Sequence, residues 1–263
     1  MAPFISTVTS LFVSTRVSVC LPARNEEATI GTALAPLMQM HREGLIEAPV
    51  VVDESTDWTG EIAASMGAHV YRQCELVPEL GAVRGKGDAM WRALQVLDGD
   101  VVLFLDADST SIQRHYLFAM CAPLLTGEAD LVKGFYRRPL GADPDGGGRV
   151  NHLLARPLLR AHFPELSWIR QPLAGETALT RTLAWSLPFV TGFGVVMGLL
   201  LDAHGAGARV QQADLHRHEH RHRPLSALSS MADQIMDTTL HRAGLRREAP
   251  HERPSMREYT PVG

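Results

Sequence analysis

The chain has 263 residues, of which 45% are hydrophobic, enough for one large domain or two small ones around a substantial buried core. A formal net charge of −4 lacks the basic excess that marks nucleic-acid-binding proteins, so we expect no nucleic-acid partner. Three scattered cysteines, without the close spacing of a zinc or redox motif, indicate reduced thiols in a cytoplasmic protein.

The N-terminal stretch is apolar like a signal peptide, but it lacks a basic start and Arg16 interrupts it. The longest apolar run elsewhere, 195–201, is far shorter than the ~20 residues that cross a bilayer. We therefore expect no membrane partner and assign the residues from Arg16 onward to the first strand of the fold.

Short apolar runs of strand length alternate with helical patterns through the first half of the chain. The run VVLFL at 101–105 is continuously apolar, as in a strand that is buried on both faces of a parallel sheet. The alternation predicts an α/β fold with an open, mostly parallel sheet flanked by helices. Strands are predicted at 16–21, 49–53, 69–72 and 101–105, and helices at 26–40, 56–66 and 86–97.

The pattern is looser after residue 125. A helix is expected at 149–162, with a kink or a restart at Pro157, because proline disrupts a helix interior. The tail at 246–263 is polar and contains proline, so we expect it to be disordered. Further strands are predicted at 130–137 and 209–213, a loop at 143–148, an apolar segment at 195–202 and a helix at 225–242.

Polar clusters follow three of the predicted strands, at 22–27, 53–57 and 106–108. Ligands bind at the carboxyl ends of the strands in an open α/β sheet, so the clusters together predict one site. Asp106 and Asp108 flank Ala107, and carboxylate oxygens suit Mg²⁺ or Mn²⁺, which can neutralise a diphosphate. A solvated acidic turn is the alternative interpretation, and the position directly after a buried strand argues against it.

Two glycine-rich segments add candidate anion sites. Lys86 stands between glycines at a predicted helix start, where its charge, the free amides and the helix dipole suit a phosphate. Gly148 and Arg149 open another predicted helix, where the glycine allows a close approach and the arginine can fork onto a phosphate or carboxylate. An ordinary surface loop stays the alternative for each segment.

Histidines alternate with charged residues from 216 to 223. Alternation in an extended segment places the histidines on one face, and neutral imidazole is a common metal ligand. Neighbouring side chains of one strand cannot surround an ion, so we expect one histidine to join the metal site at Asp108. A solvated basic loop is the alternative.

From about 17 to 228 the chain resembles the actinobacterial glucosyl-3-phosphoglycerate synthases and the related mannosyl-3-phosphoglycerate synthases of glycosyltransferase family 81. The matching segments are LPARNEEATI, GKGDAMWRAL, VVLFLDAD, LVKGFYRRPL, GGGRVNHLLARPLL, QPLAGE, SLPF, GFG and HRHRPL. The resemblance implies a GT-A-type fold, a nucleotide-sugar donor, Mg²⁺ or Mn²⁺, retention of the anomeric configuration and a homodimer. It also implies a donor-binding half at 1–125 and an acceptor-binding half at 126–245.

The resemblance assigns roles by position in these motifs. Asp108 and His220 are the implied metal ligands, and Lys86 would stabilise the departing diphosphate together with the metal. Leu173 would face the reacting centre through its backbone carbonyl. The donor would be bound by Pro22, Ala23, Glu26, Asp53, Lys86, Asp106 and Ala107, and the acceptor by Gly148, Arg149, Asn151 and His222.

The chain departs from the family pattern at the acceptor end. Val196 stands where the family has an active-site carboxylate, Asn151 where the best-known members have threonine, and His222 where they have asparagine. Loss of a carboxylate leaves its polar partner unpaired at a cost of ~1–3 kcal/mol, which places the acceptor's identity in question.

Three functions are therefore open. The first is transfer of a hexose, expected to be glucose, from a nucleotide sugar to 3-phosphoglycerate, with UDP-glucose the expected donor and a GDP-sugar the alternative. The second is the same reaction on another small acid or phosphorylated acceptor. The third is a catalytically weak nucleotide-sugar-binding protein.

Overall fold

The computed structural model describes residues 12, 14–139, 143, 146–217 and 225–259. Within these residues, seven strands form one sheet in the order β3-β2-β1-β4-β6-β5-β8. They are β1 (Val17–Ala23), β2 (Val50–Asp53), β3 (His69–Arg72), β4 (Val101–Phe104), β5 (Leu131–Arg137), β6 (Thr177–Thr180) and β8 (Val210–Arg217). The helices are α2 (Ile30–Arg42), α3 (Thr59–Ser65), α4 (Lys86–Ala93), α5 (Arg114–Leu125), α6 (Arg156–His162), α7 (Arg181–Ser186), α8 (Val195–Gly205) and α9 (Ser229–Arg242).

The sheet is mostly parallel, as predicted. Strands β3, β2, β1 and β4 run parallel to one another, and β8 runs parallel to β5. Strand β6 is antiparallel to both of its neighbours, β4 and β5, and so joins the two parallel parts. This strand was not predicted, because its sequence TALT is short and half polar.

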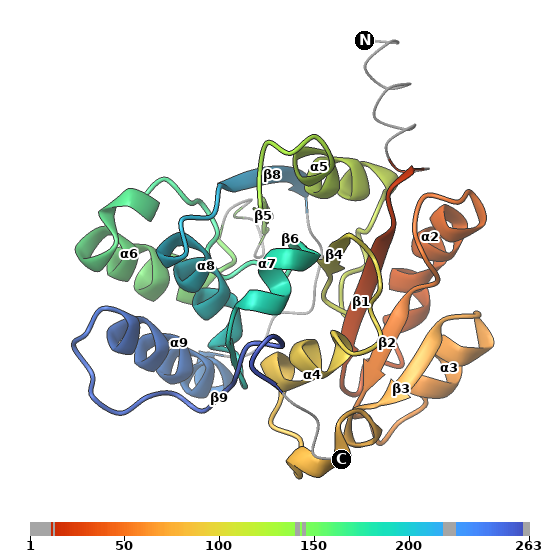
Figure 1. Cartoon of the computed structure of the whole chain (residues 1–263), viewed down its shortest axis with the longest axis horizontal. Helices are drawn as coiled ribbons and strands as arrows, with labels where there is room; N and C mark the ends of the chain where they lie inside the picture. Colours follow the sequence, from red (N-terminus) through yellow and green to blue (C-terminus); the bar gives the residue numbers. More distant parts are fainter. Residues whose placement is uncertain (1–11, 13, 140–142, 144–145, 218–224, 260–263) are drawn as a thin grey trace.

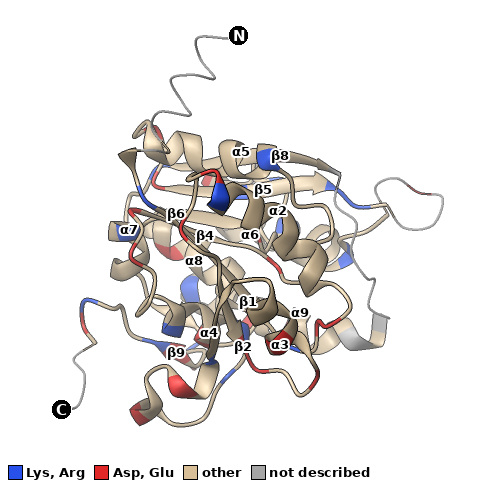
Figure 2. Ribbon diagram, turned by 90° about the vertical axis from the view of Figure 1, so that its right-hand side faces the viewer, with Lys and Arg blue, Asp and Glu red and all other residues tan. Residues whose placement is uncertain are grey.

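Helices cover both faces of the sheet, which passes through the middle of the molecule (Figure 1). Successive residues of a strand point to opposite faces, so Val19 and Leu21 of β1 join one core and Cys20 joins the other. The first core includes α2 and α5, and the second includes α4, α8 and α9. Charged residues lie mostly on loops and helix ends, and β1 and β4 carry none (Figure 2).

The predicted restart at Pro157 is confirmed. Helix α6 begins at Arg156 with the proline in its first turn, where a missing N–H costs no helical hydrogen bond. A π-helical turn, Asn151–Ala155, directly precedes it. Such turns are often found at functional sites, and this one places Asn151 in the wall of the pocket described below.

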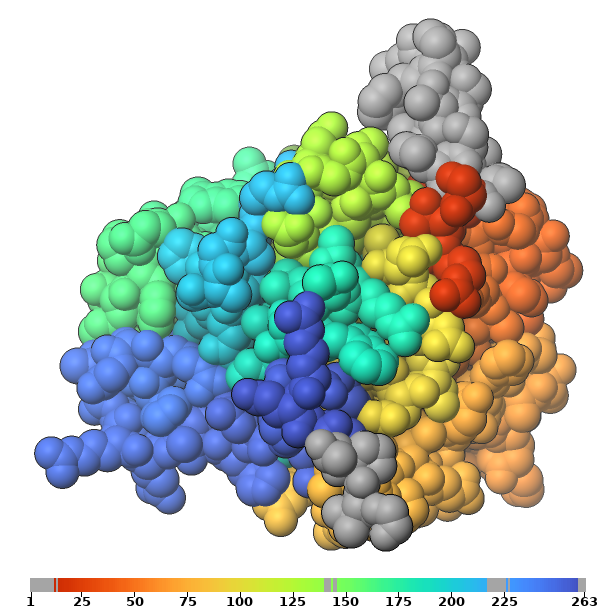
Figure 3. Space-filling view, in the orientation of Figure 1, coloured from red at the N-terminus to blue at the C-terminus, as the bar shows by residue number. Residues whose placement is uncertain are grey.

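Residues 246–259, which we call the C-terminal strap, are ordered by contacts with the rest of the fold. The expectation that the tail at 246–263 is disordered is therefore wrong for these residues. Strand β9 (Glu252–Arg253) of the strap pairs with β7 (Phe189–Val190). Arg253 donates to both carboxylate oxygens of Asp88, at 2.7 and 3.1 Å, and Trp91 donates to the carbonyl of Pro254 at 2.7 Å. The prediction failed because it used local polarity, whereas these long-range bonds hold the strap against α4 and the segment around β7 (Figure 3).

Among the described residues, no helix combines the length and the apolar character that a membrane crossing needs.

Candidate active site

A pocket of about 400 Å³ opens at the carboxyl ends of β1 and β4. The backbone N–H of Leu105 donates to the carbonyl of Cys20 at 3.0 Å, and this register brings the polar cluster after β4 beside the cluster that ends β1. Most of the predicted site residues line the pocket together: Pro22, Ala23, Glu26, Lys86, Asp106, Ala107, Asp108, Gly148, Arg149, Asn151 and Leu173. His220 and His222 lie outside the described residues.

Asp53 does not line the pocket, although the resemblance implies a donor contact for it. Its side chain is 2% exposed and accepts a hydrogen bond from the backbone N–H of Ser55 at 3.0 Å. Arg72 forms an ion pair with the same carboxylate at 3.4 Å. In this structure Asp53 therefore shapes the loop after β2.

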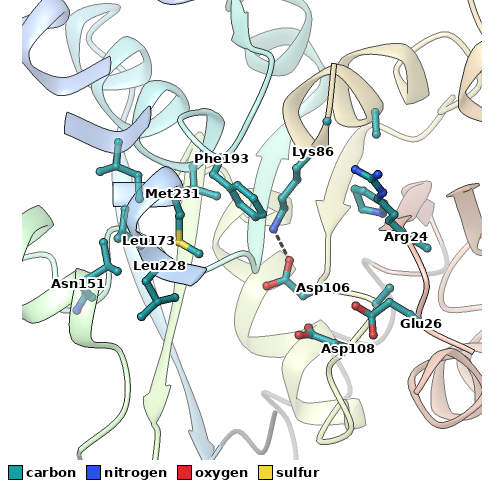
Figure 4. Close-up of a pocket in the computed structure, with 18 of the residues that line it drawn as sticks. Arg24, Glu26, Lys86, Asp106, Asp108, Asn151, Leu173, Phe193, Leu228 and Met231 are labelled. Atoms are coloured by element: carbon teal, nitrogen blue, oxygen red, sulfur yellow. Dashed lines mark hydrogen bonds and ion pairs between the residues drawn. The ribbon is translucent and has the colours of Figure 1, made fainter. Parts of the chain in front are cut away.

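The loop after β2 and the first residue of α3 are in turn bonded to the turn after β1, which lines the pocket. The backbone N–H of Asn25 donates to Ser55, and the N–H of Glu26 donates to Thr59, both at 2.8 Å. Asn25 has a φ of 57°, a left-handed conformation that asparagine tolerates better than most residues. These bonds hold the turn after β1 so that Glu26 points toward Asp108 (Figure 4).

Lys86 and Asp106 form an ion pair inside the pocket (Figure 4). Burial on its own would lower the pKa of Lys86, but the carboxylates of Asp106, Glu176 and Asp108 outweigh it and raise that pKa. A Cβ atom at Gly175 would overlap the carboxylate of Asp106, so only glycine fits there. The ammonium group of Lys86 therefore stays charged and is available to an anionic ligand.

Asp108 lies near several other carboxylates, and the single positive charge of Lys86 does not balance them. Burial, followed by the charges of Asp106 and Glu26, raises the pKa of Asp108 to about 7. A divalent cation with oxygen ligands would relieve this repulsion, so the residues present fit Mg²⁺ or Mn²⁺. Groups of three potential ligands with the spacing of a complete metal site do not occur among the described side chains.

The start of α4 differs from its predicted role in one respect. The N–H groups of Gly87 and Asp88 already donate to the carbonyls of Gly192 and Thr191, at 3.3 and 2.9 Å. A Cβ atom at Gly87 would overlap the carbonyl oxygen of Val190, which explains the glycine. The prediction that these amides are free is therefore wrong, and the side chain of Lys86 is the group that α4 presents to the pocket.

The opposite end of the pocket combines arginine and asparagine side chains with an apolar wall. Asn151 is 5% exposed, and its side-chain N–H donates to the carbonyl of Arg170 at 3.1 Å. Its side-chain oxygen has no hydrogen-bond partner within the described part of the chain, so it can accept a bond from a ligand. Gly148, Arg149 and Arg138 line the same end.

Several lining residues were not among the site residues expected from the sequence. The apolar wall includes Phe193 before α8 and Met231 and Ile235 on α9 (Figure 4). Apolar residues on helices are usually core residues, and the packing of α8 and α9 in the fold brings these three to the pocket. Val196, noted as a departure from the family pattern, lines this wall and is 6% exposed.

Comparisons with known proteins agree with this geometry. A family model described as glycosyl transferase family 2 matches residues 18–197. The glucosyl-3-phosphoglycerate synthase of Mycobacterium tuberculosis (strain ATCC 25618 / H37Rv) is 43% identical over 264 residues, covering 94% of this chain and 78% of the relative. The enzyme of that name from Petrotoga mobilis is 38% identical over 237 residues, covering 86% of this chain and 73% of the relative.

Solved structures match over nearly the whole chain. The M. tuberculosis glucosyl-3-phosphoglycerate synthase in complex with Mn²⁺, UDP-glucose and phosphoglyceric acid superposes with a TM-score of 0.88 at 37% identity, covering 96% of this chain and 94% of that one. A second structure of that enzyme, with Mn²⁺, UDP-glucose and glycerol 3-phosphate, gives a TM-score of 0.86 at 37% identity and the same coverages. These matches confirm the predicted GT-A-type fold.

Proposed function

The chain matches the model of glycosyl transferase family 2 and belongs to the glucosyl-3-phosphoglycerate synthases, and on this premise we propose that it transfers glucose from UDP-glucose to 3-phosphoglycerate. The observation that carries the proposal is a single pocket that joins Lys86, Asp106 and Asp108 at one end to Arg149 and Asn151 at the other. One end suits a nucleoside diphosphate with its cation, and the other suits a small anion with a hydroxyl group.

In the proposed donor complex, residues 1–125 bind UDP-glucose and residues 126–245 bind the acceptor. Asp108 would hold Mn²⁺ or Mg²⁺ with His220 as a second ligand, and the cation would supply Lewis-acid neutralisation of the diphosphate. The ammonium group of Lys86 would turn from Asp106 to a phosphate oxygen, or contact both, because it is charged and lines the pocket. Its charge then stabilises the diphosphate as it departs.

The acceptor is held by side chains of the second half. The guanidinium of Arg149 would fork onto the phosphate or carboxylate, and the side-chain oxygen of Asn151 would accept a hydrogen bond from a hydroxyl group. The backbone carbonyl of Leu173 would face the anomeric carbon. Fixing both substrates in this geometry removes the entropic cost of their encounter.

The reaction needs no protein nucleophile. The bond between the anomeric carbon and the diphosphate oxygen breaks, and the acceptor oxygen forms the new bond on the same face of the sugar. The acceptor's hydroxyl proton passes to the departing phosphate oxygen. The α configuration of UDP-glucose is therefore retained in the product, which NMR of that product would check.

A second candidate differs only in the acceptor. Val196 contributes an apolar, 6% exposed side chain to the pocket, so this position supplies no carboxylate to accept a bond from the sugar or the acceptor. This observation favours another small acid or phosphorylated acceptor over 3-phosphoglycerate.

The test is turnover of UDP-glucose with Mn²⁺, with product mass measured for each acceptor. The panel contains 3-phosphoglycerate, glycerol 3-phosphate and glycerate, and GDP-glucose replaces UDP-glucose in a parallel series. Product from 3-phosphoglycerate supports the first proposal, and product from another acceptor alone supports the second. Binding of UDP-glucose without turnover on any acceptor would instead indicate a nucleotide-sugar-binding protein.

The homodimer and the cytoplasmic location stay predictions of the resemblance and the composition. Light scattering of the purified chain measures its mass in solution, and fractionation of the source cells measures its location. A monomer, or recovery in the membrane fraction, would contradict them.

A further inference from the structure

Lys133 is a fully buried lysine beneath the pocket that the proposed reaction leaves unexplained. It lies on β5, is 0% exposed and does not line the pocket. Burial, followed by the charge of Lys86, lowers the pKa of Lys133 to about 7, whereas Glu176 and Asp106 act in the opposite direction. A buried amine carries a cost in free energy that an apolar side chain of the same length would avoid.

Lysine is rare in this chain, which makes a buried lysine at position 133 more unusual. Lys86 and Lys133 are the only lysines in the chain, and every other strongly basic side chain is arginine. The charge of Asp106 raises the pKa of both lysines, and the charge of Lys86 lowers the pKa of Lys133. The amine of lysine is more compact than the guanidinium of arginine and can lie buried with fewer hydrogen-bond partners. Both positions therefore favour lysine over arginine.

The amine of Lys133 bonds to residues 171–176, which we call the floor segment, and to the residue that follows them. The amine donates to the backbone carbonyl of Ala174 at 2.6 Å. It also donates to the side-chain oxygen of Thr177, which directly follows the floor segment, at 2.9 Å. The lysine thus joins the interior of β5 to the backbone between Leu173 and Gly175.

The floor segment carries two features of the active site. Leu173 lines the pocket, and the backbone at Gly175 packs so closely on Asp106 that a Cβ atom would overlap the carboxylate. Strand β5 fastens both ends of the segment, since Tyr136 donates its N–H to the side chain of Gln171 at 3.2 Å and Gly134 donates to the carbonyl of Glu176 at 3.0 Å. Between these ends, the bond from Lys133 holds the carbonyl of Ala174.

We infer that Lys133 is a positioning residue, which fixes the floor segment so that Leu173 and Asp106 keep the geometry of the reacting centre. Without the amine, the buried carbonyl of Ala174 loses a partner and the middle of the segment is free to move relative to Asp106. Misplacement of reacting groups by about 1 Å can cost on the order of 100-fold in rate. The effect on turnover rests on the proposed transfer reaction, whereas the effect on the segment does not.

The variant Lys133→Met keeps the length of the side chain and removes the amine. We expect kcat to fall about 100-fold while KM for UDP-glucose stays within about twofold of the wild type. The matched control is Val132→Ala on the same strand, which is fully buried in the core and touches the pocket nowhere. It should lower the melting temperature with kcat within about twofold.

Hydrogen exchange gives a readout that needs no turnover. Peptides covering 171–176 should exchange at least about tenfold faster in Lys133→Met than in the wild type, and at the wild-type rate in Val132→Ala. If the wild type is inactive but these peptides lose protection, the proposed reaction fails and the positioning role stands. Wild-type exchange in Lys133→Met, or an equal loss of kcat in Val132→Ala, would overturn the inference.

A milder variant covers the case in which Lys133→Met does not fold. Thr177→Val removes one of the two acceptors and keeps the shape of the side chain, so we expect a loss of kcat of about threefold to tenfold with faster exchange at 171–176. Wild-type kcat and wild-type exchange in Thr177→Val would contradict the role of Lys133.

Discussion

Replacement of Asp88 by asparagine should destabilise the protein through two buried arginines. The carboxylate of Asp88 is 0% exposed and pairs with Arg92 and Arg253, whose side chains are 0% and 8% exposed. Removal of one partner from a buried ion pair typically costs about 3–5 kcal/mol, because the remaining charge stays buried without compensation. Arg92 also donates to the carbonyls of Val77 and Gly81, at 3.1 and 2.9 Å. Because these bonds remain in the variant and partly compensate the charge, we expect a loss at the lower end of the range, about 3 kcal/mol.

That loss is measurable as a shift in melting temperature. A chain of this size loses about 2–4 °C for each kcal/mol, so Asp88→Asn should melt about 6–12 °C below the wild type. The control is Asp98→Asn, because Asp98 is 69% exposed in its ion pair with Arg181 and should contribute little. Calorimetry or thermal denaturation at pH 7 compares the three proteins.

The pH dependence gives a second, independent check. Burial alone would raise the pKa of Asp88, but the hydrogen bonds and charges of Arg253 and Arg92 outweigh it and hold that pKa below the usual value. The stabilisation is therefore fully present above the unfolded-state pKa of about 4 and disappears as the pH falls through the lower, folded-state pKa. The difference between the wild type and Asp88→Asn should be constant from about pH 5 to 8 and should narrow below about pH 4.

Two results would refute this reasoning. One is a melting temperature for Asp88→Asn that equals that of Asp98→Asn. The other is a difference from the wild type that persists unchanged in strong acid, which would mean that the asparagine acts through packing and not through charge.

Three further substitutions test the pocket. Asp108→Ala should reduce turnover with Mn²⁺ at least about 100-fold and abolish the Mn²⁺-dependent thermal stabilisation by UDP-glucose, and wild-type turnover would contradict the metal assignment. Asn151→Ala should raise KM for the acceptor about tenfold, because the loss of one hydrogen bond of about 1.4 kcal/mol corresponds to a tenfold change, and KM for UDP-glucose should stay unchanged. An equal rise in both KM values would place Asn151 outside the acceptor site. Gly175→Ala should lower kcat at least about 100-fold, because its Cβ would overlap the carboxylate of Asp106, and steady-state kinetics showing full activity would refute that packing.

The sequence predicted the elements whose signals are local. The apolar run at 101–105 and the Asp106–Asp108 pair after it both lie where a buried parallel strand and its carboxyl end should place them. The antiparallel β6 was missed, since the partners that make TALT a strand are far away in the chain and a four-residue, half-polar segment carries no periodicity.

The site was predictable only in part for the same reason. Charged residues in motifs, such as Lys86 and Arg149, could be assigned to the pocket from the sequence. Met231 and Ile235 could not, because their role depends on how α9 packs against the rest of the fold. The occupied amides at the start of α4 depend on the carbonyls of Thr191 and Gly192, more than a hundred residues away, as the hydrogen bonds to Gly87 and Asp88 show.

The C-terminal strap also bears on how the protein is made. Asp88 and Arg253, whose side chains pair in the interior, are separated by 165 residues. At a synthesis rate of ~5–20 residues per second, Arg253 is therefore added about 8–33 s after Asp88. Throughout that time Trp91 has no strap residues to contact on the nascent chain. Helix α4, which carries Lys86, therefore completes its contacts with the strap only after translation has passed residue 253, and the indole of Trp91 lacks those contacts on the ribosome-bound chain.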